Sequence, residues 1–357
     1  MIPLMIASTR SYAGKSGLVA SLILEAADRG VKVGYFKPFG AMPVAVGSVT
    51  TDRDATYLSS LASADVPVES LCPAVSTPTL IEAALNGHVQ DLVPRMLEAY
   101  RVVADRADLV LIEGPGDLTQ GRAFGLDTFS LSRLLSCRVV LIDRNDRGTV
   151  IPDHVLHAYD LLGDSLMGVV LNDVPPERES HARDRIVPYL ETQGVRVLGV
   201  LAHDASLSTV TASDILMGVA GVVLAAADHL DQEVESFMVG AMGHERALSY
   251  FKRRDRKAVI TGGDRADVQL AALRTDTSVL ICTGGTTPSA TVLGRAEDAG
   301  VPVILVEMDT FAAVSAMEET FGHVRVHDAG KVARIREMLC ANVDIDAVFS
   351  ELAAAAS

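Results

Sequence analysis

Short apolar runs that alternate with amphipathic stretches constrain the fold of this chain more than any other feature of its sequence. The stretches between the runs, such as Gly17–Asp28 and Ile81–Ala104, have helical periodicity. Such alternation is typical of βαβ units and predicts an α/β domain with a doubly wound, mostly parallel sheet. The runs with the length and aliphatic composition of buried strands are Ile2–Ala7, Val31–Phe36, Leu109–Ile112, Val139–Ile142, Gly168–Leu171 and Val197–Leu201.

A second α/β run follows the turn-rich segment Ala205–Ser213 and starts near Ile215. The chain of 357 residues is long enough for two domains. We therefore predict a first domain at residues 1–208, a smaller α/β domain at 212–335 and a helical tail at 336–357. The strands expected in the smaller domain are Phe237–Gly240, Ala258–Thr261, Ser278–Thr283, Pro302–Val306 and Val324–Val326.

Composition argues against several classes of partner. The formal net charge of −15 disfavours binding to nucleic acid or to an anionic membrane surface, because both need a basic face. No apolar run reaches the roughly 18 residues that a membrane span needs. The four cysteines are far apart in the sequence and indicate buried thiols in a reducing compartment. The sequence thus predicts a soluble, cytoplasmic protein.

The segment between the first strand and the first helix contains the clearest motif. Gly14, Lys15 and Ser16 match the end of the phosphate-loop pattern G-x-x-x-x-G-K-[ST], whereas Thr9 stands at the first glycine of that pattern. Such a loop binds phosphate with backbone N–H groups, a lysine and a Mg²⁺-binding hydroxyl. The alternative is an ordinary βα turn with a surface lysine. The residues predicted to bind ATP in this loop are Ser11, Tyr12, Ala13, Gly14, Lys15, Ser16 and Gly17.

Polar residues that follow other strands are expected to face the same crevice, because ligands of open α/β sheets bind beyond the carboxyl ends of the strands. Lys37 ends the second strand and Glu113 ends the third. Asp52 or Asp54 could complete a Mg²⁺ shell, or either could cap the helix that begins nearby. Asn172 could pair with a base edge, or could belong to a turn.

Two Thr-Gly-Gly turns in the second run, at Thr261 and Thr283, each end a strand and open a helix. Glycine permits backbone angles that other residues resist, so such turns can form a concave nest for an anion. The alternative is that the glycines only make tight connections. The predicted effector-binding or self-association surface consists of Gly262, Gly263, Asp264, Arg265, Gly284 and Gly285.

Together the strand-end residues of the first half resemble dethiobiotin synthetase and its relatives. In that family a strand ends in Lys-Pro, an Asp and a Glu-Gly follow, and an Asn contacts adenine. The segments Phe39–Met42 and Pro115–Leu118 do not match the substrate pocket of that family, so the nucleotide half of the resemblance is the stronger one. The residues here that stand in the family's order are Gly14-Lys15-Ser16, Lys37-Pro38, Asp52 or Asp54, Glu113-Gly114 and Asn172.

The second half resembles the DRTGG domain. Its matching stretches are Gly240–Met242, Thr261–Asp267, Thr283–Gly285 and Asp309-Thr310. This pair of domains is similar to the N-terminal region of long-form phosphotransacetylases. The resemblance implies a free-standing relative of that regulatory region, without the acetyltransferase domain and its activity.

Three functions are compatible with these residues. The first is an ATP- and Mg²⁺-binding regulatory or sensor protein, a homo-oligomer whose second domain binds a small effector or self-associates. The second is an ATP-dependent ligase that acts on a small amine or carboxylic acid. In that function Lys15 and Lys37 neutralise the transferring phosphoryl group, while Ser16, Asp54 and Glu113 hold Mg²⁺. The third is a structural scaffold with a vestigial loop.

Overall fold

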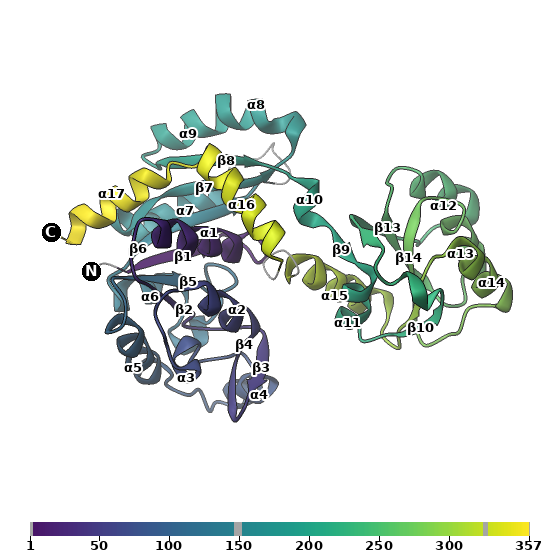
Figure 1. Cartoon of the computed structure of the whole chain (residues 1–357), viewed down its shortest axis with the longest axis horizontal. Coiled ribbons are helices and arrows are strands. Elements are labelled where there is room, and N and C mark those ends of the chain that lie inside the picture. The colour runs from purple at the N-terminus through teal and green to yellow at the C-terminus, as the bar shows by residue number, and fades with distance from the viewer. Residues whose placement is uncertain (1–2, 146–151, 324–327, 357) are drawn as a thin grey trace. The chain divides into compact units, whose positions relative to one another are not determined.

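The structure, a computed structural model, describes residues 3–145, 152–323 and 328–356 of the chain (Figure 1). The chain folds into two compact units. The first unit comprises residues 1–203 and 329–357, and the second comprises residues 204–328. No helix in the described ranges is both long enough and apolar enough to cross a membrane.

The first unit is built on a six-stranded sheet with the strand order β2-β5-β1-β6-β7-β8, in which every neighbouring pair is parallel. The predicted doubly wound, mostly parallel sheet is therefore confirmed. Every residue of β1 and β5 is buried, as the aliphatic runs predict. The strands are β1 (Leu4–Ser8), β2 (Val33–Phe36), β5 (Leu109–Glu113), β6 (Arg138–Arg144), β7 (Leu166–Val174) and β8 (Val197–Ala202).

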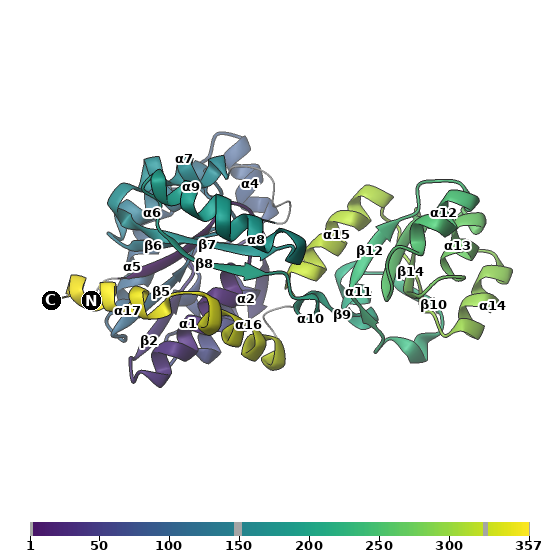
Figure 2. The same cartoon turned by 90° about the horizontal axis from the view of Figure 1, so that it is seen from above.

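Helices cover both faces of this sheet. Figure 2 shows α1 and α16 on one face and α6, α7 and α9 on the other. Met96 of α5, Leu131 of α6 and Val155 of α7 join one aliphatic core with Met5 of β1. The helices are α1 (Lys15–Asp28), α2 (Arg53–Leu61), α3 (Val68–Leu71), α4 (Pro78–Leu85), α5 (Val93–Ala104), α6 (Thr128–Leu134), α7 (Asp153–Leu162), α8 (Glu179–His181), α9 (Val187–Thr192), α16 (Ala329–Asn342) and α17 (Ile345–Ala356). Short 3-10 segments lie at Arg122–Phe124, Gly163–Ser165 and Pro176–Arg178, and a π segment lies at Ala182–Ile186.

A β-hairpin that sequence periodicity does not predict lies between β2 and α2. Its strands, β3 (Pro43–Val46) and β4 (Val49–Asp52), are antiparallel and joined at Gly47, which has a φ of 61°. Most of its residues are exposed or half-buried, so it has no apolar signature. The hairpin delivers Asp52 to the first turn of α2.

The structure places the end of the second unit differently from the predicted boundary at residue 335. That boundary falls inside α16, which is one continuous helix and belongs to the first unit. The physical reason is that α16 packs on α1: a Cβ atom at Gly17 would lie 3.1 Å from the Cδ1 atom of Ile335. A propensity pattern in the sequence gives no information on which domain a terminal helix packs against.

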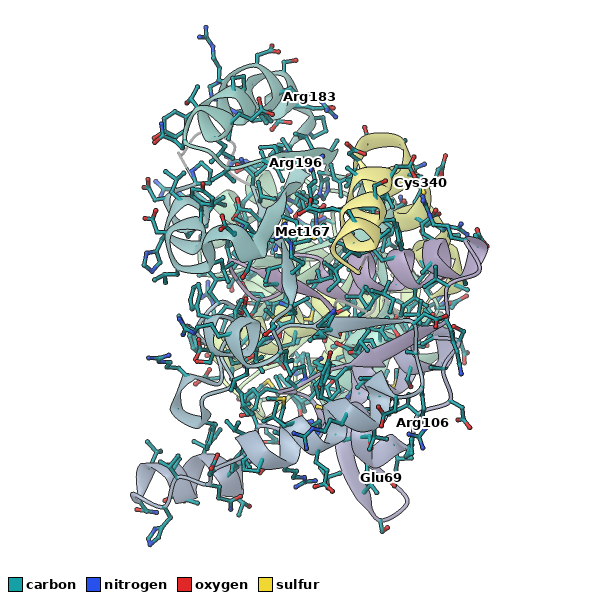
Figure 3. The ribbon with its side chains drawn as sticks, turned by 90° about the vertical axis from the view of Figure 1, so that its left-hand side faces the viewer. Glu69, Arg106, Met167, Arg183, Arg196 and Cys340 are labelled. Carbon is teal, nitrogen blue, oxygen red and sulfur yellow. The ribbon has the colours of Figure 1, made fainter. Side chains whose placement is uncertain are left out.

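Polar contacts also attach the two C-terminal helices to the first unit. Arg336 lies 2.7 Å from Glu25 of α1, and the thiol of Cys340 donates to the same carboxylate at 3.2 Å. Arg196, which precedes β8, lies 3.6 Å from Glu351 of α17. Figure 3 labels Cys340 and Arg196. The second unit is thus an insertion between β8 and α16 in the sequence of the first.

The second unit contains a five-stranded sheet with the order β10-β15-β14-β13-β12. Its last four strands are parallel and correspond to four of the predicted strands, whereas β10 is antiparallel to β15 and was not predicted. The predicted strand Val324–Val326 lies outside the described residues. The strands are β10 (Val222–Ala225), β12 (Ser236–Val239), β13 (Lys257–Gly262), β14 (Thr277–Thr283) and β15 (Val303–Leu305), and β9 (Val210–Thr211) pairs with β11 (Glu233–Val234).

Aliphatic cores cover the two faces of the second sheet. Ile260 and Ile281 belong to one core, and Val259 and Leu280 belong to the other, because side chains alternate along a strand. The helices are α10 (Ala205–Ser208), α11 (Ala212–Gly218), α12 (His244–Phe251), α13 (Ala266–Ala272), α14 (Ala290–Ala299) and α15 (Thr310–His323), with a 3-10 turn at Ala227–His229.

Candidate functional site

The loop between β1 and α1 turns sharply into the helix. Tyr12 and Gly14 have positive φ values of 57° and 104°. Lys15, the first residue of α1, is buried, and its Nζ donates to the Ser8 Oγ and to the Gly116 carbonyl, both at 2.7 Å. Burial lowers the pKa of Lys15 to about 8, although the nearby Glu113 acts in the opposite direction. A buried lysine thus lies at the helix N-terminus, where a phosphate group is stabilised.

Asn172 lies against this loop from β7. Its Nδ2 donates to the Ala13 carbonyl at 2.8 Å, and a Cβ atom at Gly14 would lie only 2.5 Å from that nitrogen. Glycine is therefore needed at position 14 for steric reasons as well as for its φ. The predicted contact between Asn172 and adenine stays a prediction.

Glu113 is the centre of a buried network at the end of β5. The Ser16 Oγ donates to its Oε1 at 2.7 Å, and the Tyr35 hydroxyl donates to its Oε2 at 2.6 Å. Lys37 lies 3.9 Å from the same Oε2. The sequence-based site did not include Tyr35. Tyr35 could have been identified from its two-residue spacing from Lys37, because that spacing places both side chains on one face of an extended segment.

Three carboxylates surround Lys37. Its Nζ lies 2.8 Å from Asp52, 3.8 Å from Asp54 and 3.9 Å from Glu113. Burial acts to lower the pKa of Lys37, but these carboxylates outweigh it and hold that pKa above its usual value. The structure therefore brings together Lys15, Lys37, Asp54 and Glu113, as the positions of the strand ends predict.

Asp52 has the cap role that the sequence left open. Its carboxylate is fully buried and accepts from the backbone N–H groups of Asp54 at 3.0 Å and Ala55 at 3.3 Å, so it caps α2. Its other oxygen accepts from the N–H groups of Ala41 and Met42, both at 3.0 Å. Together with Lys37, these donors use both oxygens of Asp52. Asp54 is therefore the better candidate for a ligand of Mg²⁺.

Thr9 has a buried partner that explains the missing glycine. Its hydroxyl donates to Asp143 Oδ1 at 2.6 Å, and the Nε2 of His154 lies 3.0 Å from the same oxygen. The hydrogen bond to Asp143 raises the pKa of His154. Asp143 is on β6 and was missed in the sequence analysis. Its position near the end of a buried strand could have identified it as a candidate site residue. The side chain at position 9 thus ties the loop to the sheet.

Among the residues that the structure describes, no three His, Cys, Asp or Glu side chains form a metal-binding group. The predicted Mg²⁺ ligands are a hydroxyl and two carboxylates, and Mg²⁺ usually takes only one or two carboxylates together with phosphate oxygens and water. The Ser16 Oγ lies 2.7 Å from Glu113, and the Lys37 Nζ lies 3.8 Å from Asp54 and 3.9 Å from Glu113. These residues fit such an ion, and the set of Ser16, Asp54 and Glu113 stays a prediction.

In the second unit, the two glycine turns lie side by side. The Gly263 N–H donates to the Thr283 carbonyl at 3.1 Å. Gly284 and Gly285 both have positive φ, and a Cβ atom at Gly285 would lie 2.5 Å from the Glu307 Oε2. These turns therefore need glycine, and Glu307, which the sequence analysis missed, places a carboxylate beside them.

Arg265 does not extend freely from the first of these turns. Its Nη2 donates to the Met242 carbonyl at 2.9 Å, and its Nε lies 3.4 Å from Asp267. Gly262, Gly263 and Asp264 stay predicted parts of an effector or association surface. The acidic Glu307 makes an anion nest at this position less favourable than the glycine pattern alone indicates.

Sequence comparisons agree with the two units. A family profile described as an AAA domain matches residues 3–211, and a DRTGG domain profile matches residues 214–320. The phosphate acetyltransferase of Synechocystis sp. is 25% identical over 77% of this chain and 40% of that protein. The phosphate acetyltransferase of Nitratidesulfovibrio vulgaris is 24% identical over 98% of this chain and 51% of that protein. The chain therefore spans about half the length of these curated relatives.

Solved structures match parts of the chain with low overall similarity. The CBS and DRTGG domains of the regulatory region of Clostridium perfringens pyrophosphatase are 24% identical, over 32% of this chain and 49% of that one, with a TM-score of 0.29. The MinD cell division protein of Aquifex aeolicus is 12% identical, over 58% of this chain and 84% of that one, with a TM-score of 0.33. On the two profile matches, the chain belongs to the AAA-domain family and combines its P-loop domain with a DRTGG domain, as the N-terminal region of long-form phosphotransacetylases does.

Proposed function

We propose that this chain is an ATP- and Mg²⁺-binding regulatory protein. The nucleotide binds at the loop before α1, and the second unit responds to a small molecule or self-associates. In this proposal the two units alone do not transfer an acetyl group. The observation that supports the proposal most directly is the convergence of Lys15, Ser16, Lys37 and Glu113 beside the N-terminus of α1.

The residues of the loop have complementary tasks in this proposal. The backbone N–H groups at the start of α1 and the Lys15 ammonium group bind the phosphates. Lys15 now donates to two neutral oxygens, on Ser8 and Gly116, and phosphate oxygens are stronger acceptors that take their place. Mg²⁺, when bound, neutralises phosphate charge. Tyr35 keeps the Glu113 carboxylate oriented toward Ser16.

The surroundings of Lys37 favour a regulatory function over a ligase. A ligase of the dethiobiotin synthetase type needs Lys37 to neutralise the transferring phosphoryl group. Here Lys37 is paired with the buried Asp52, which also occupies the N–H groups of Ala41 and Met42. In this proposal Asp52 uses donors that would otherwise be available to an acidic substrate.

The two functions differ in their response to substrates. ATP hydrolysis measured with and without small carboxylic acids and amines separates them. The regulatory proposal expects ATP binding without stimulation of hydrolysis by any of these compounds. Saturable stimulation by one of them would replace the proposal with the ligase function.

The pH dependence of ATP binding tests the state of Lys15. Its pKa is lowered to about 8, so it is charged below pH 8 and loses its proton above it. Since bound phosphate favours the charged form, ATP affinity is expected to be steady from about pH 7 to 8 and to fall above pH 8, by up to about tenfold per pH unit. Calorimetric titrations across this range measure the effect. In Lys15→Arg the guanidinium group stays charged, so a residual affinity with a flat profile is expected.

A flat profile in the wild type would contradict the lowered pKa of Lys15. An equal fall in Lys15→Arg would show that another group sets the pH dependence.

The glycine turns of the second unit have a separate test. In Gly285→Val the new side chain meets Glu307 and is strained at a φ of 63°. ATP binding in the first unit is expected to stay nearly intact, while the sedimentation mass or the response of ATP binding to small anionic metabolites changes. Gly294→Val is the matched control, because a Cβ atom at Gly294 meets nothing within 4 Å. A folded Gly285→Val protein that equals wild type in both measurements would leave these glycines a purely structural role.

A further inference from the structure

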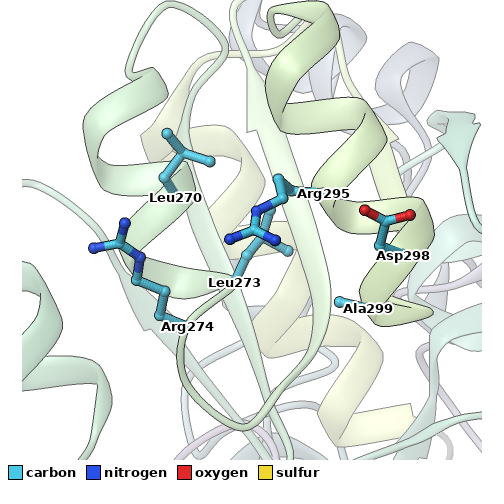
Figure 4. Close-up of a pocket in the computed structure, with 6 residues that line it drawn as sticks. All are labelled: Leu270, Leu273, Arg274, Arg295, Asp298 and Ala299. Carbon is cyan, nitrogen blue, oxygen red and sulfur yellow. The ribbon is translucent and has the colours of Figure 1, made fainter.

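The second unit has a cavity that the function proposed above does not use. It has a volume of about 210 Å³ and lies between the C-terminal ends of α13 and α14 (Figure 4). Its walls are formed by Leu270, Leu273, Arg274, Arg295, Asp298 and Ala299.

This cavity is distinct from the surface at the glycine turns. Those turns precede α13 and α14, whereas the cavity lies where the same helices end. The helices have seven and ten residues, which corresponds to a separation of roughly 10–15 Å at 1.5 Å per residue. A ligand in the cavity therefore does not touch Gly263 or Gly285.

Two arginines of the cavity have no partner within the described residues. The guanidinium groups of Arg274 and Arg295 make no hydrogen bond or ion pair there. Two other arginines of this unit are engaged: Arg256 lies 2.8 Å from Glu233, and Arg265 donates to Met242. What distinguishes Arg274 and Arg295 is that both exposed side chains line one cavity.

The simplest alternative is that each arginine is a solvated surface residue, because both side chains are exposed and neither lies in the last turn of its helix. That alternative explains each position separately, but it does not explain why both line a cavity with an apolar floor. Leu270 and Leu273 form this floor and pack against the aliphatic core of the unit. With Asp298, the charged groups of the lining sum to +1.

We propose that this cavity binds a small organic anion, a carboxylate or a phosphate monoester with a short aliphatic body. A guanidinium group presents parallel N–H donors that match carboxylate and phosphate oxygens, and two such groups give a strong anion site. The leucine floor contacts the aliphatic body. Asp298 repels a second anionic group on the ligand and accepts a hydrogen bond from a hydroxyl group.

The size of the cavity limits the ligand. Sites for drug-sized ligands range from roughly 300 to 1,000 Å³, so a cavity of 210 Å³ fits a compound of only a few carbon atoms. The glycine pattern predicts anion binding at the Thr-Gly-Gly turns, whereas this proposal places it in the cavity. At the turns, Glu307 lies beside Gly285 and Arg265 is already engaged.

The test uses the full chain with labelled leucine methyl groups and no ATP. Butyl phosphate is the probe, and inorganic phosphate and butanol are its two halves. Saturable NMR shifts are expected at the methyl groups of Leu270 and Leu273 with butyl phosphate. Phosphate is expected to bind more weakly, and butanol is expected to cause no saturable shift. Because ATP is absent, the result does not depend on nucleotide binding in the first unit.

Two double variants distinguish binding at these two arginines from a general effect of positive charge. Arg274→Gln with Arg295→Gln is expected to weaken butyl phosphate binding at least about tenfold, since two charge-assisted contacts are lost. Lys252→Gln with Arg254→Gln removes the same charge from an exposed segment and is expected to leave binding unchanged. Equal weakening in both double variants, or the absence of saturable shifts at the two leucines, would overturn the proposal.

Discussion

Replacing Lys15 with alanine is expected to weaken ATP binding in the presence of Mg²⁺ by about 10- to 100-fold. A hydrogen bond to a charged group contributes about 1.5–3 kcal/mol, and every 1.4 kcal/mol corresponds to a factor of ten in affinity. Lys15 is buried at the N-terminus of α1 and donates to Ser8 and Gly116, so its ammonium group is already held at the loop. Isothermal titration calorimetry of the two proteins measures the difference.

Lys32→Ala is the matched control for this experiment. Lys32 is an exposed lysine of the same unit, and its removal changes the net charge by the same amount. ATP affinity is expected to stay within about twofold of wild type in this control. Equal affinity in wild type and Lys15→Ala would rule out nucleotide binding at this loop and would favour the vestigial scaffold.

Replacing Asp52 with asparagine is expected to lower the free energy of unfolding of the first unit by about 3 kcal/mol or more. Breaking a buried ion pair by removing one partner costs about 3–5 kcal/mol, because the remaining charge stays buried. Asp52 accepts from four backbone N–H groups and from Lys37, and an asparagine side chain has only one oxygen to accept with. Urea denaturation followed by circular dichroism measures the change.

The size of this effect distinguishes two roles of Asp52. If Asp52 acted only as a helix cap, its loss would cost about 1 kcal/mol. A value near 3 kcal/mol or above supports its pairing with Lys37, and a value near 1 kcal/mol contradicts it. Asp65→Asn provides the control, because Asp65 is an exposed carboxylate four residues after the end of α2 and should be neutral.

The pairing of Lys37 with Asp52 also bears on the choice between sensor and ligase. If Asp52→Asn frees Lys37, the variant is expected to bind ATP at least as tightly as wild type, because one negative charge near the phosphates is removed. In a ligase, the same change would remove a residue that positions Lys37. The variant thus reports on both stability and nucleotide binding.

The local features of this protein could be predicted from its sequence alone. The aliphatic runs and their spacing predicted the six parallel strands of the first sheet, because a strand buried on both faces needs a continuous apolar segment. Gly14, Lys15 and Ser16 indicated a phosphate loop because the glycine, the lysine and the hydroxyl are consecutive in the chain. The Thr-Gly-Gly turns likewise indicated sharp strand-to-helix connections.

Residues that have equivalent roles in the sequence analysis are distinguished by their contacts in the tertiary structure. Asp52 and Asp54 are two residues apart, and the backbone N–H groups of Asp54 and Ala55, which donate to the Asp52 carboxylate, assign the cap to Asp52. The hydroxyl of Tyr35 reaches Glu113 only because β2 and β5 are neighbours in the sheet. The sequence cannot specify such pairings, because they depend on strand order and register.

The same reason explains the other features that appeared only in three dimensions. Helix α16 belongs to the first unit because Ile335 packs against Gly17, more than 300 residues away in the chain. Arg274 and Arg295 line one cavity because α13 and α14 flank a common strand, β14. Motifs made of consecutive residues can therefore be recognised in the sequence, whereas contacts between distant segments depend on how the whole chain packs.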